Sequence, residues 1–236
     1  MKPDSNQSSP RRPFVLVNMS MAADGKIATA NRAVSSFSSA GDQRHLLELR
    51  ATADAVMCGA RTADLNRITL GPGGGAFRRA RIRRGLREFN LRIVVSPSGT
   101  LDPRAHLFAD RRSPVVVLTT SRCPATRLAR LREVADVVRV CGCRAIEWDP
   151  TLRWLRTEWK VHRLLCEGGG ELNSALFRAG IVDEIHVTLC PKIIGGREAP
   201  TISDGLGGKL RDAAKFEIQS VRRTGDEFFL VLAAHA

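Results

Sequence analysis

Three consecutive glycines stand where an apolar segment gives way to a segment with helical spacing. Residues 164–170 read LLCEGGG, and residues 171–179 follow with a helical pattern. Glycines at a strand-to-helix turn let the backbone approach a ligand closely, and the N–H groups of a first helical turn favour an anion. The turn therefore predicts a phosphate or pyrophosphate site. A tight turn without a ligand is an equally good interpretation of the glycines alone.

A second group of polar residues follows the first apolar segment. Residues 18–26 read NMSMAADGK, so Asn18 and Asp24 come after an expected strand. Polar groups at the carboxyl ends of parallel strands line the crevice in which α/β proteins bind ligands. Asn18 and Asp24 are thus candidate ligand contacts, although Asp-Gly taken alone slightly favours an ordinary turn.

Two further residues flank the second apolar segment. Arg50 precedes it, and Thr62 closes the sequence GART that follows it. A guanidinium can hold a phosphate through two parallel hydrogen bonds, so Arg50 is a candidate phosphate ligand. Thr62 could bond a cofactor phosphate, and capping of the next helix explains it at least as well.

The sequence lacks the motifs of several enzyme classes. The chain contains no H-x-E with a later P-C-x-x-C, no G-x-S-x-G and no H-E-x-x-H, and its five histidines lie far apart. We therefore expect no metal site. Cys58, Cys166 and Cys190 lie in apolar segments, where cysteine acts as a small hydrophobe, which favours reduced thiols in a cytoplasmic protein.

Length, composition and net charge restrict the class of protein. The 236 residues include 37 Lys and Arg against 24 Asp and Glu, a net charge of +13, and 43% are hydrophobic. These values exclude an intrinsically disordered chain. No apolar run approaches the roughly 20 residues that span a bilayer. We expect a disordered tail over residues 1–12 and a single domain over residues 13–236.

The positive charge is concentrated in one place. Residues 76–92 contain seven arginines and one glutamate, and the preceding GPGGG of residues 71–75 is typical of a flexible opening. The chain has no Tyr, so the aromatic partners on which single-stranded nucleic acids stack are scarce. An arginine-rich insert at about residues 71–90, forming a solvated loop or helix face, is favoured over a nucleic-acid site.

Short apolar segments rich in β-branched residues alternate with helical ones, which indicates an α/β fold with a mostly parallel sheet. The expected strands are 13–19, 54–59, 91–96, 115–119 and 161–166, and the expected helices are 40–53, 124–133, 151–159 and 171–179. Three later segments, 183–190, 215–222 and 227–233, have little helix between them and predict an antiparallel C-terminal edge. The glycine-rich loop 191–210 is expected to be functional or to pack against the site.

Taken in order, these motifs resemble the pyrimidine reductases of riboflavin biosynthesis, which form the reductase domain of the bifunctional deaminase-reductase and have the dihydrofolate-reductase-like fold. The resemblance runs from residue 13 to about 232. Its anchors are residues 18–26, 49–51, 54–56, 59–62, 93–95, 167–170, 180–184 and 191–196. The continuation REAPT, residues 197–201, is similar to the standalone archaeal and fungal enzymes.

The resemblance implies NADPH-dependent reduction of the ribosyl group of a (di)aminopyrimidine 5′-phosphate to ribityl, with hydride passing to C1′ of the ring-opened imine. It also implies a homodimer. It assigns the cofactor to Met21, Thr62, Asn66, Ser96, Gly168, Gly169, Gly170, Glu171, Leu172 and Asn173. It assigns the substrate to Asn18, Arg50, Leu70 and Glu167, with Arg50 near the 5′-phosphate, and proton transfer to Asp24 or Glu167.

The chain departs from the family pattern at several positions. Asn66 stands where the family has Asp, Arg61 replaces a small residue, and the arginine-rich insert follows Leu70. Ser96 replaces the usual Asp, which would ease the approach of an anionic 2′-phosphate, for which Arg122 is another candidate. Two alternatives stay open: a paralogue that reduces another pteridine or pyrimidine, including dihydrofolate, and a basic nucleic-acid-binding module built on the insert.

Overall fold

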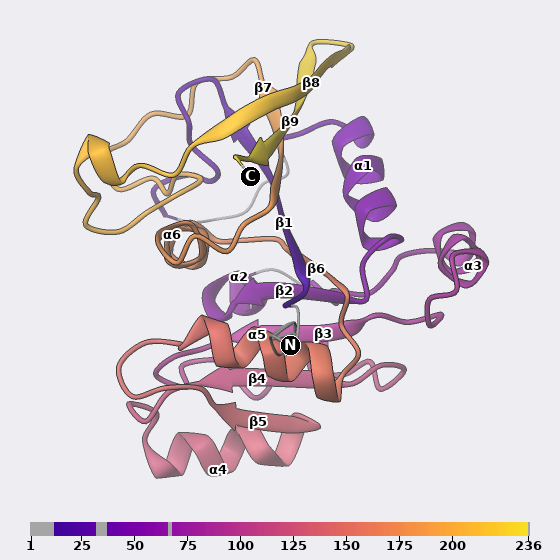
Figure 1. Ribbon diagram of the computed structural model, residues 1–236, viewed down its shortest axis with the longest axis vertical. Helices are drawn as coiled ribbons and strands as arrows, with labels where there is room; N and C mark the ends of the chain where they lie inside the picture. The colour runs from indigo at the N-terminus through magenta and orange to yellow at the C-terminus, as the bar shows by residue number, and fades with distance from the viewer. Residues whose placement is uncertain (1–11, 32–36, 66–67, 236) are drawn as a thin grey trace, which may run out of the picture.

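One twisted sheet runs through the whole described chain (Figure 1). The structure is a computed structural model, and it describes residues 12–31, 37–65 and 68–235. The predicted tail lies outside these ranges apart from Arg12. The Arg12 guanidinium donates to both carboxylate oxygens of Asp183, each at 2.7 Å, and so fixes the start of the first strand beside the start of a later one.

The sheet has nine strands in the order β5-β4-β3-β2-β6-β1-β7-β9-β8. The strands are β1 (Phe14–Ala22), β2 (Ala55–Gly59), β3 (Leu91–Val95), β4 (Val115–Thr119), β5 (Val137–Val140), β6 (Arg163–Cys166), β7 (Glu184–Cys190), β8 (Phe216–Thr224) and β9 (Glu227–Ala234). Strands β1 to β7 are parallel, and β9 pairs antiparallel with both β7 and β8. The predicted α/β class with an antiparallel C-terminal edge is confirmed.

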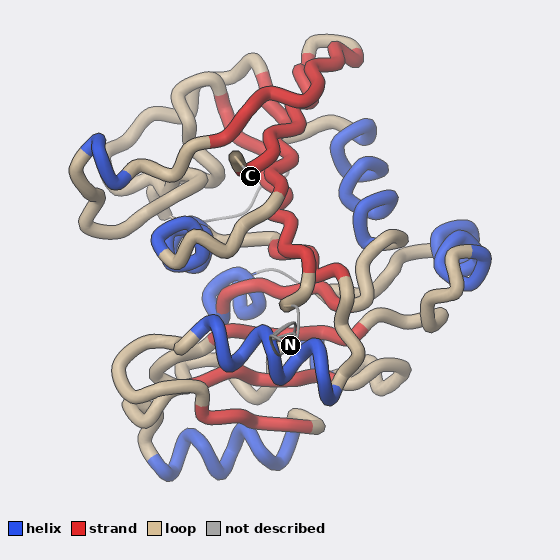
Figure 2. The backbone as a smooth tube through the Cα atoms, in the orientation of Figure 1, coloured by secondary structure: helices blue, strands red, loops and turns tan. Residues whose placement is uncertain are grey.

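Helices cover both faces of the parallel part (Figure 2). One face packs against α5 (Trp148–Glu158) and α6 (Gly170–Arg178), and the other packs against α1 (Ala40–Arg50), α2 (Ala60–Leu65) and α4 (Ala125–Val134). All five residues of β3 are buried, with Leu91, Ile93 and Val95 in one core and Val94 in the other. Burial on both faces explains why the central strands read as continuous apolar segments.

Strand β1 is longer than its sequence predicts. We expected it to end at Met19, but it runs to Ala22 because β7 pairs with it as far as the pair Ala22 and Cys190. Asn18 and Met21 therefore lie within the strand, and Asp24 lies in the turn that follows it.

The arginine-rich insert contains the helix α3 (Gly75–Arg83) and is closed at its base, where the Asn90 side chain donates to the Leu70 carbonyl at 2.8 Å. The expectation of a solvated face is wrong for Arg81 and Arg92, which are both 1% exposed. Arg92 donates to three backbone carbonyls, those of Leu107, Asp110 and Ser113. Part of the local charge therefore serves to satisfy buried carbonyl groups.

Candidate active site

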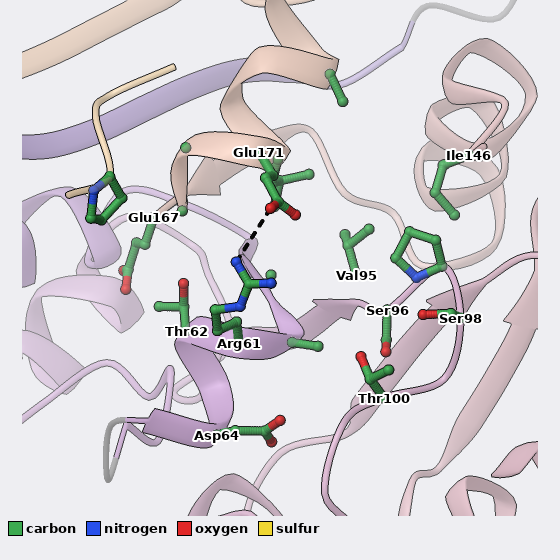
Figure 3. A pocket seen from close by; sticks show the side chains of 18 of the residues that line it. Arg61, Thr62, Asp64, Val95, Ser96, Ser98, Thr100, Ile146, Glu167 and Glu171 are labelled. Carbon is green, nitrogen blue, oxygen red and sulfur yellow. Dashed lines mark hydrogen bonds and ion pairs between the residues drawn. The ribbon is translucent and has the colours of Figure 1, made fainter. Parts of the chain in front are cut away.

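A cleft of about 790 Å³ opens at the carboxyl ends of the parallel strands. The segments that follow β1, β2, β3, β4, β5 and β6 contribute to it, together with Met19 of β1 and Pro200 of the glycine-rich loop. The carboxyl edge of a parallel sheet is the usual ligand position in α/β proteins, and the volume suits a small-molecule site. Figure 3 shows Glu167 beside Thr62 and, further along the wall, the group Ser96, Ser98 and Thr100.

The triple glycine forms the turn between β6 and α6 at one end of this cleft. Gly168 has a φ of +76°, in the left-handed region that favours glycine. Gly169 is the N-cap residue of α6, and no side-chain hydrogen bond from the described residues caps that helix. Gly169, Gly170, Glu171 and Leu172 all line the cleft. The first turn of α6 therefore presents backbone N–H groups and the positive end of a helix dipole to a ligand.

The two glycines of the turn that line the cleft, Gly169 and Gly170, have different surroundings. A Cβ added to Gly169 would lie 3.3 Å from the Thr62 hydroxyl and within 4 Å of no other heavy atom. A Cβ added to Gly170 would lie only 2.4 Å from the Thr201 carbonyl oxygen. Gly169 thus leaves room for a ligand beside Thr62, whereas Gly170 leaves room for the 201–204 segment of the protein itself.

Two exposed arginines stand at the other end of the cleft. Arg122 follows β4, Arg144 follows β5, and neither pairs with a carboxylate of the described residues. Ser96, at the end of β3, contributes no charge to this wall, and its hydroxyl accepts from the Leu101 N–H at 3.2 Å. The cleft therefore has a helix N-terminus at one end and two guanidinium groups at the other.

Arg50 and Glu167 form a buried ion pair at the edge of the cleft. The Nε and Nη2 groups of Arg50 each donate to one carboxylate oxygen of Glu167 at 2.6 Å, and Nη1 donates to the Gly71 carbonyl at 2.8 Å. Burial alone would lower the pKa of Arg50, but the adjacent carboxylate outweighs it and the pKa is raised. The two-pronged edge of Arg50 faces Glu167, and Glu167 in turn lines the cleft.

Asp24 has a different task in this structure. Its carboxylate accepts from the Gly195 N–H at 2.7 Å and from the Ile194 N–H at 3.4 Å. The Gly195 bond is the main cause of a lowered pKa, so Asp24 is ionised at neutral pH. It anchors the glycine-rich loop and does not line the cleft.

The remaining substrate candidates lie on the α1 side of the sheet. Strand alternation puts Asn18 on the same face as Leu16, and the Asn18 side-chain oxygen is buried without a hydrogen-bond partner among the described residues. Leu70 is fully buried in the core on that face. Such an orphaned amide oxygen suits a ligand that brings a donor.

Other candidate cofactor residues support the cleft without lining it. Met21 packs against the core on the α6 side, and a Cβ on Gly168 would meet the sulfur of Met19 at 2.6 Å. The Asn173 side chain donates to the Ile202 carbonyl at 2.9 Å and so holds the segment around Ile202 against α6. Asn66 lies outside the described residues.

Several lining residues were not among the sequence candidates. Arg61 bridges to Glu171 at 3.2 Å across the mouth of the cleft (Figure 3). Arg144 and Ile146 come from the loop after β5, and Trp148 is the first residue of α5. The available signal was positional, because loops at the carboxyl ends of adjacent parallel strands must share one edge.

Comparison with known proteins decides the family. The chain matches the family described as RibD C-terminal domain over residues 13–230. It belongs to this family. A 2,5-diamino-6-ribosylamino-4(3H)-pyrimidinone 5′-phosphate reductase from Methanothermobacter thermautotrophicus is 34% identical over 222 residues, which are 93% of this chain and 97% of the relative. A protein of the same name from Archaeoglobus fulgidus is 33% identical over 92% of this chain and 96% of its own.

Solved structures of RibD proteins share the fold. A pyrimidine reductase-like protein from Corynebacterium diphtheriae has a TM-score of 0.77 at 21% identity, covering 95% of this chain and 92% of its own. RibD from Acinetobacter baumannii has a TM-score of 0.74 at 19% identity, covering 95% of this chain and 58% of its own. The predicted family and dihydrofolate-reductase-like fold are therefore confirmed, and the named relatives support the predicted oxidoreductase.

The described part of the RibD C-terminal domain has neither a metal-binding cluster nor a membrane-spanning helix. No group of three or more His, Cys, Asp or Glu side chains there could hold a metal ion. Among the same residues, every helix is too short or too polar to cross a membrane.

Proposed function

We propose that this protein reduces the ribosyl group of 2,5-diamino-6-ribosylamino-4(3H)-pyrimidinone 5′-phosphate to ribityl with NADPH. The observation that carries the proposal is the uncapped α6 N-terminus, which opens with its glycines onto the cleft beside Glu167. The reductases named above, 33–34% identical over nearly the whole chain, support the substrate. A nicotinamide cofactor supplies the hydride in such reductions.

The residues fit a dinucleotide phosphate along the cleft. The first-turn N–H groups of α6 would bind the pyrophosphate, with Gly169 and Thr62 beside it, because an uncapped helix N-terminus favours an anion. Arg122 and Arg144 would bind the 2′-phosphate, since both guanidinium groups lie at the far wall without a carboxylate partner among the described residues. That contact would make NADPH the preferred cofactor over NADH.

Glu167 is our candidate for the group that acts on the reacting centre. Addition of hydride to C1′ moves the electron pair of the C=N bond onto nitrogen, so the step is easiest when the imine nitrogen is already protonated, and its product is then a neutral amine. A carboxylate fixed beside that nitrogen would stabilise its protonated, cationic form. Glu167 meets this requirement because it lines the cleft and both of its oxygens are held by Arg50. We propose that Arg50 serves the substrate by orienting Glu167.

The substrate assignment can be tested by NADPH oxidation with the purified protein. We expect turnover with the ribosylaminopyrimidine phosphate and none with dihydrofolate, and a large but measurable fall in kcat in Glu167→Gln with NADPH binding retained. Turnover with dihydrofolate only would favour the paralogue. A protein that binds oligonucleotides in a salt-sensitive manner and does not bind NADPH would contradict the enzyme assignment altogether.

We also propose that the protein works as a homodimer. Strand β8 is the outer edge of the sheet and is exposed along almost its whole length. Ile218 and Val221 on this strand are 65% and 56% exposed, which is unusual for aliphatic side chains in a regular strand. Light scattering should give twice the chain mass, and Val221→Lys should reduce it to the monomer.

A further inference from the structure

The arginine-rich insert contacts Arg50 at two separate places. On the incoming side, the Gly71 carbonyl accepts from Nη1 of Arg50 at 2.8 Å. On the helical side, Nη1 of Arg81 donates to the backbone carbonyl of Arg50 at 2.6 Å. The insert thus holds both the side chain and the backbone of the residue that orients Glu167.

Arg81 is placed to fix the end of α1. It is 1% exposed, and its Nη1 group also donates to the Ala53 carbonyl at 2.6 Å. Its Nε group donates to the Arg87 carbonyl at 2.9 Å, which ties the guanidinium to its own insert. Carbonyl groups at a helix C-terminus lack intrahelical partners and carry partial negative charge, so a buried cation there satisfies and stabilises them.

Burial lowers the pKa of Arg81 to about 10, so its guanidinium stays charged at neutral pH. The guanidinium of Arg81 is buried and donates only to backbone carbonyls, with no carboxylate oxygen at hydrogen-bond distance. Such a buried charge is costly unless these carbonyls stay in place. Arg81 therefore links the end of α1 to the insert.

We propose that Arg81 is a positioning residue for Glu167 and acts through Arg50. The inference rests on the proposed function of the cleft. The path has two links, Arg81 to the Arg50 backbone and the Arg50 guanidinium to both oxygens of Glu167. The insert in which the chain departs from the family pattern is thereby part of the support of the active site.

Arg81→Met tests the first link, because methionine keeps much of the apolar stem and removes every donor. A small displacement of a catalytic group can cost up to about a hundredfold in rate, and we expect kcat to fall about tenfold with the NADPH dissociation constant within about twofold. Arg81→Lys should restore most of kcat, because an ammonium can still donate to both carbonyls. Arg79→Met and Arg83→Met are the matched controls, since both residues are exposed on the same helix.

A double-mutant cycle with Glu167→Gln separates positioning from a general structural effect. If Arg81 acts through Glu167, Arg81→Met should lower kcat less than about twofold in the Glu167→Gln background. An equal loss in both backgrounds, or an unchanged kcat in the single variant, would overturn the proposal.

Failure of the proposed function would look different, because wild-type protein would then show no turnover of the ribosylaminopyrimidine phosphate. The four proteins of the cycle, namely the wild type, Arg81→Met, Glu167→Gln and the double variant, would in that case be compared by their free energies of unfolding. Non-additive effects of the two substitutions would support the link between Arg81 and Glu167. Additive effects would refute it without any measurement of activity.

Discussion

Adjacent glycines at the start of α6 should respond to alanine in opposite ways. A Cβ at Gly170 would lie 2.4 Å from the Thr201 carbonyl and 2.6 Å from a carboxylate oxygen of Asp204, so either the helix or this segment must shift. Overpacking of this kind costs about 1–3 kcal/mol, and in a chain of this size each kcal/mol lowers Tm by about 2–4 °C. We therefore expect Gly170→Ala to unfold at a clearly lower temperature.

Gly169→Ala should leave the fold nearly intact. Its Cβ would meet only the Thr62 hydroxyl, at 3.3 Å, and that side chain can adjust. We expect less than about 1 kcal/mol of lost stability. The same Cβ projects into the cleft where a pyrophosphate would lie, and we expect at least about tenfold weaker NADPH binding, or about 1.4 kcal/mol.

Both variants are examined by thermal unfolding without ligand and by isothermal titration with NADPH. The adjacent positions serve as each other's controls, because the substitution and the secondary structure are the same. Wild-type NADPH affinity in Gly169→Ala would refute the placement of the pyrophosphate at this turn. Wild-type stability in Gly170→Ala would refute the close packing of the 201–204 segment.

Three further outcomes are expected. In steady-state kinetics, replacing both Arg122 and Arg144 by Ala should raise KM for NADPH at least about tenfold and leave KM for NADH within about twofold. Equal changes in the two KM values would show that these residues do not bind the 2′-phosphate. Asp24→Asn should retain most of kcat, because the ionised Asp24 carboxylate accepts hydrogen bonds only from backbone N–H groups. A loss of kcat as large as in Glu167→Gln would instead support Asp24 as the proton donor. Burial, and then the nearby His186, lower the pKa of His45 below its ordinary 6.5. The contribution of His45 to stability is therefore present above pH 6.5 and is lost as the pH falls below it. Denaturant unfolding should show a smaller loss of stability at low pH in His45→Gln than in the wild type, and no such difference in the exposed control His106→Gln.

The parallel core could be predicted from sequence because burial on both faces leaves a clear apolar pattern, as in Leu91–Val95. Strand β5 was missed because Val137–Val140 is a partly exposed edge with a charge in it, and α2 was missed because six residues are too few for a helical period. The first omission mattered most for the site. It hid the loop that brings Arg144 to the cleft.

The partner of Arg50 could not be predicted in the same way. Arginine binds phosphate and carboxylate with the same two-pronged geometry, so residue type alone does not distinguish the two. Glu167 is 117 positions away in the chain, and only the packing of α1 against the end of β6 brings the two together. Glu167 was a candidate through the family resemblance, and its place directly before the glycine turn puts it in the cleft.

The net charge of +13 includes guanidinium groups that are almost fully buried. Arg50, Arg81 and Arg92 are all at least nine-tenths buried, and they direct their charge to backbone carbonyls and to one carboxylate. A further two, Arg122 and Arg144, lie in a cleft that suits a phosphorylated ligand. The net charge therefore overstates the attraction of this chain for polyanions. A buried charge that is hydrogen-bonded inside the fold contributes to stability and to the positioning of other groups more than to the binding of a partner. The basic insert is for this reason better understood from Arg81, which faces inward, than from the exposed arginines around it.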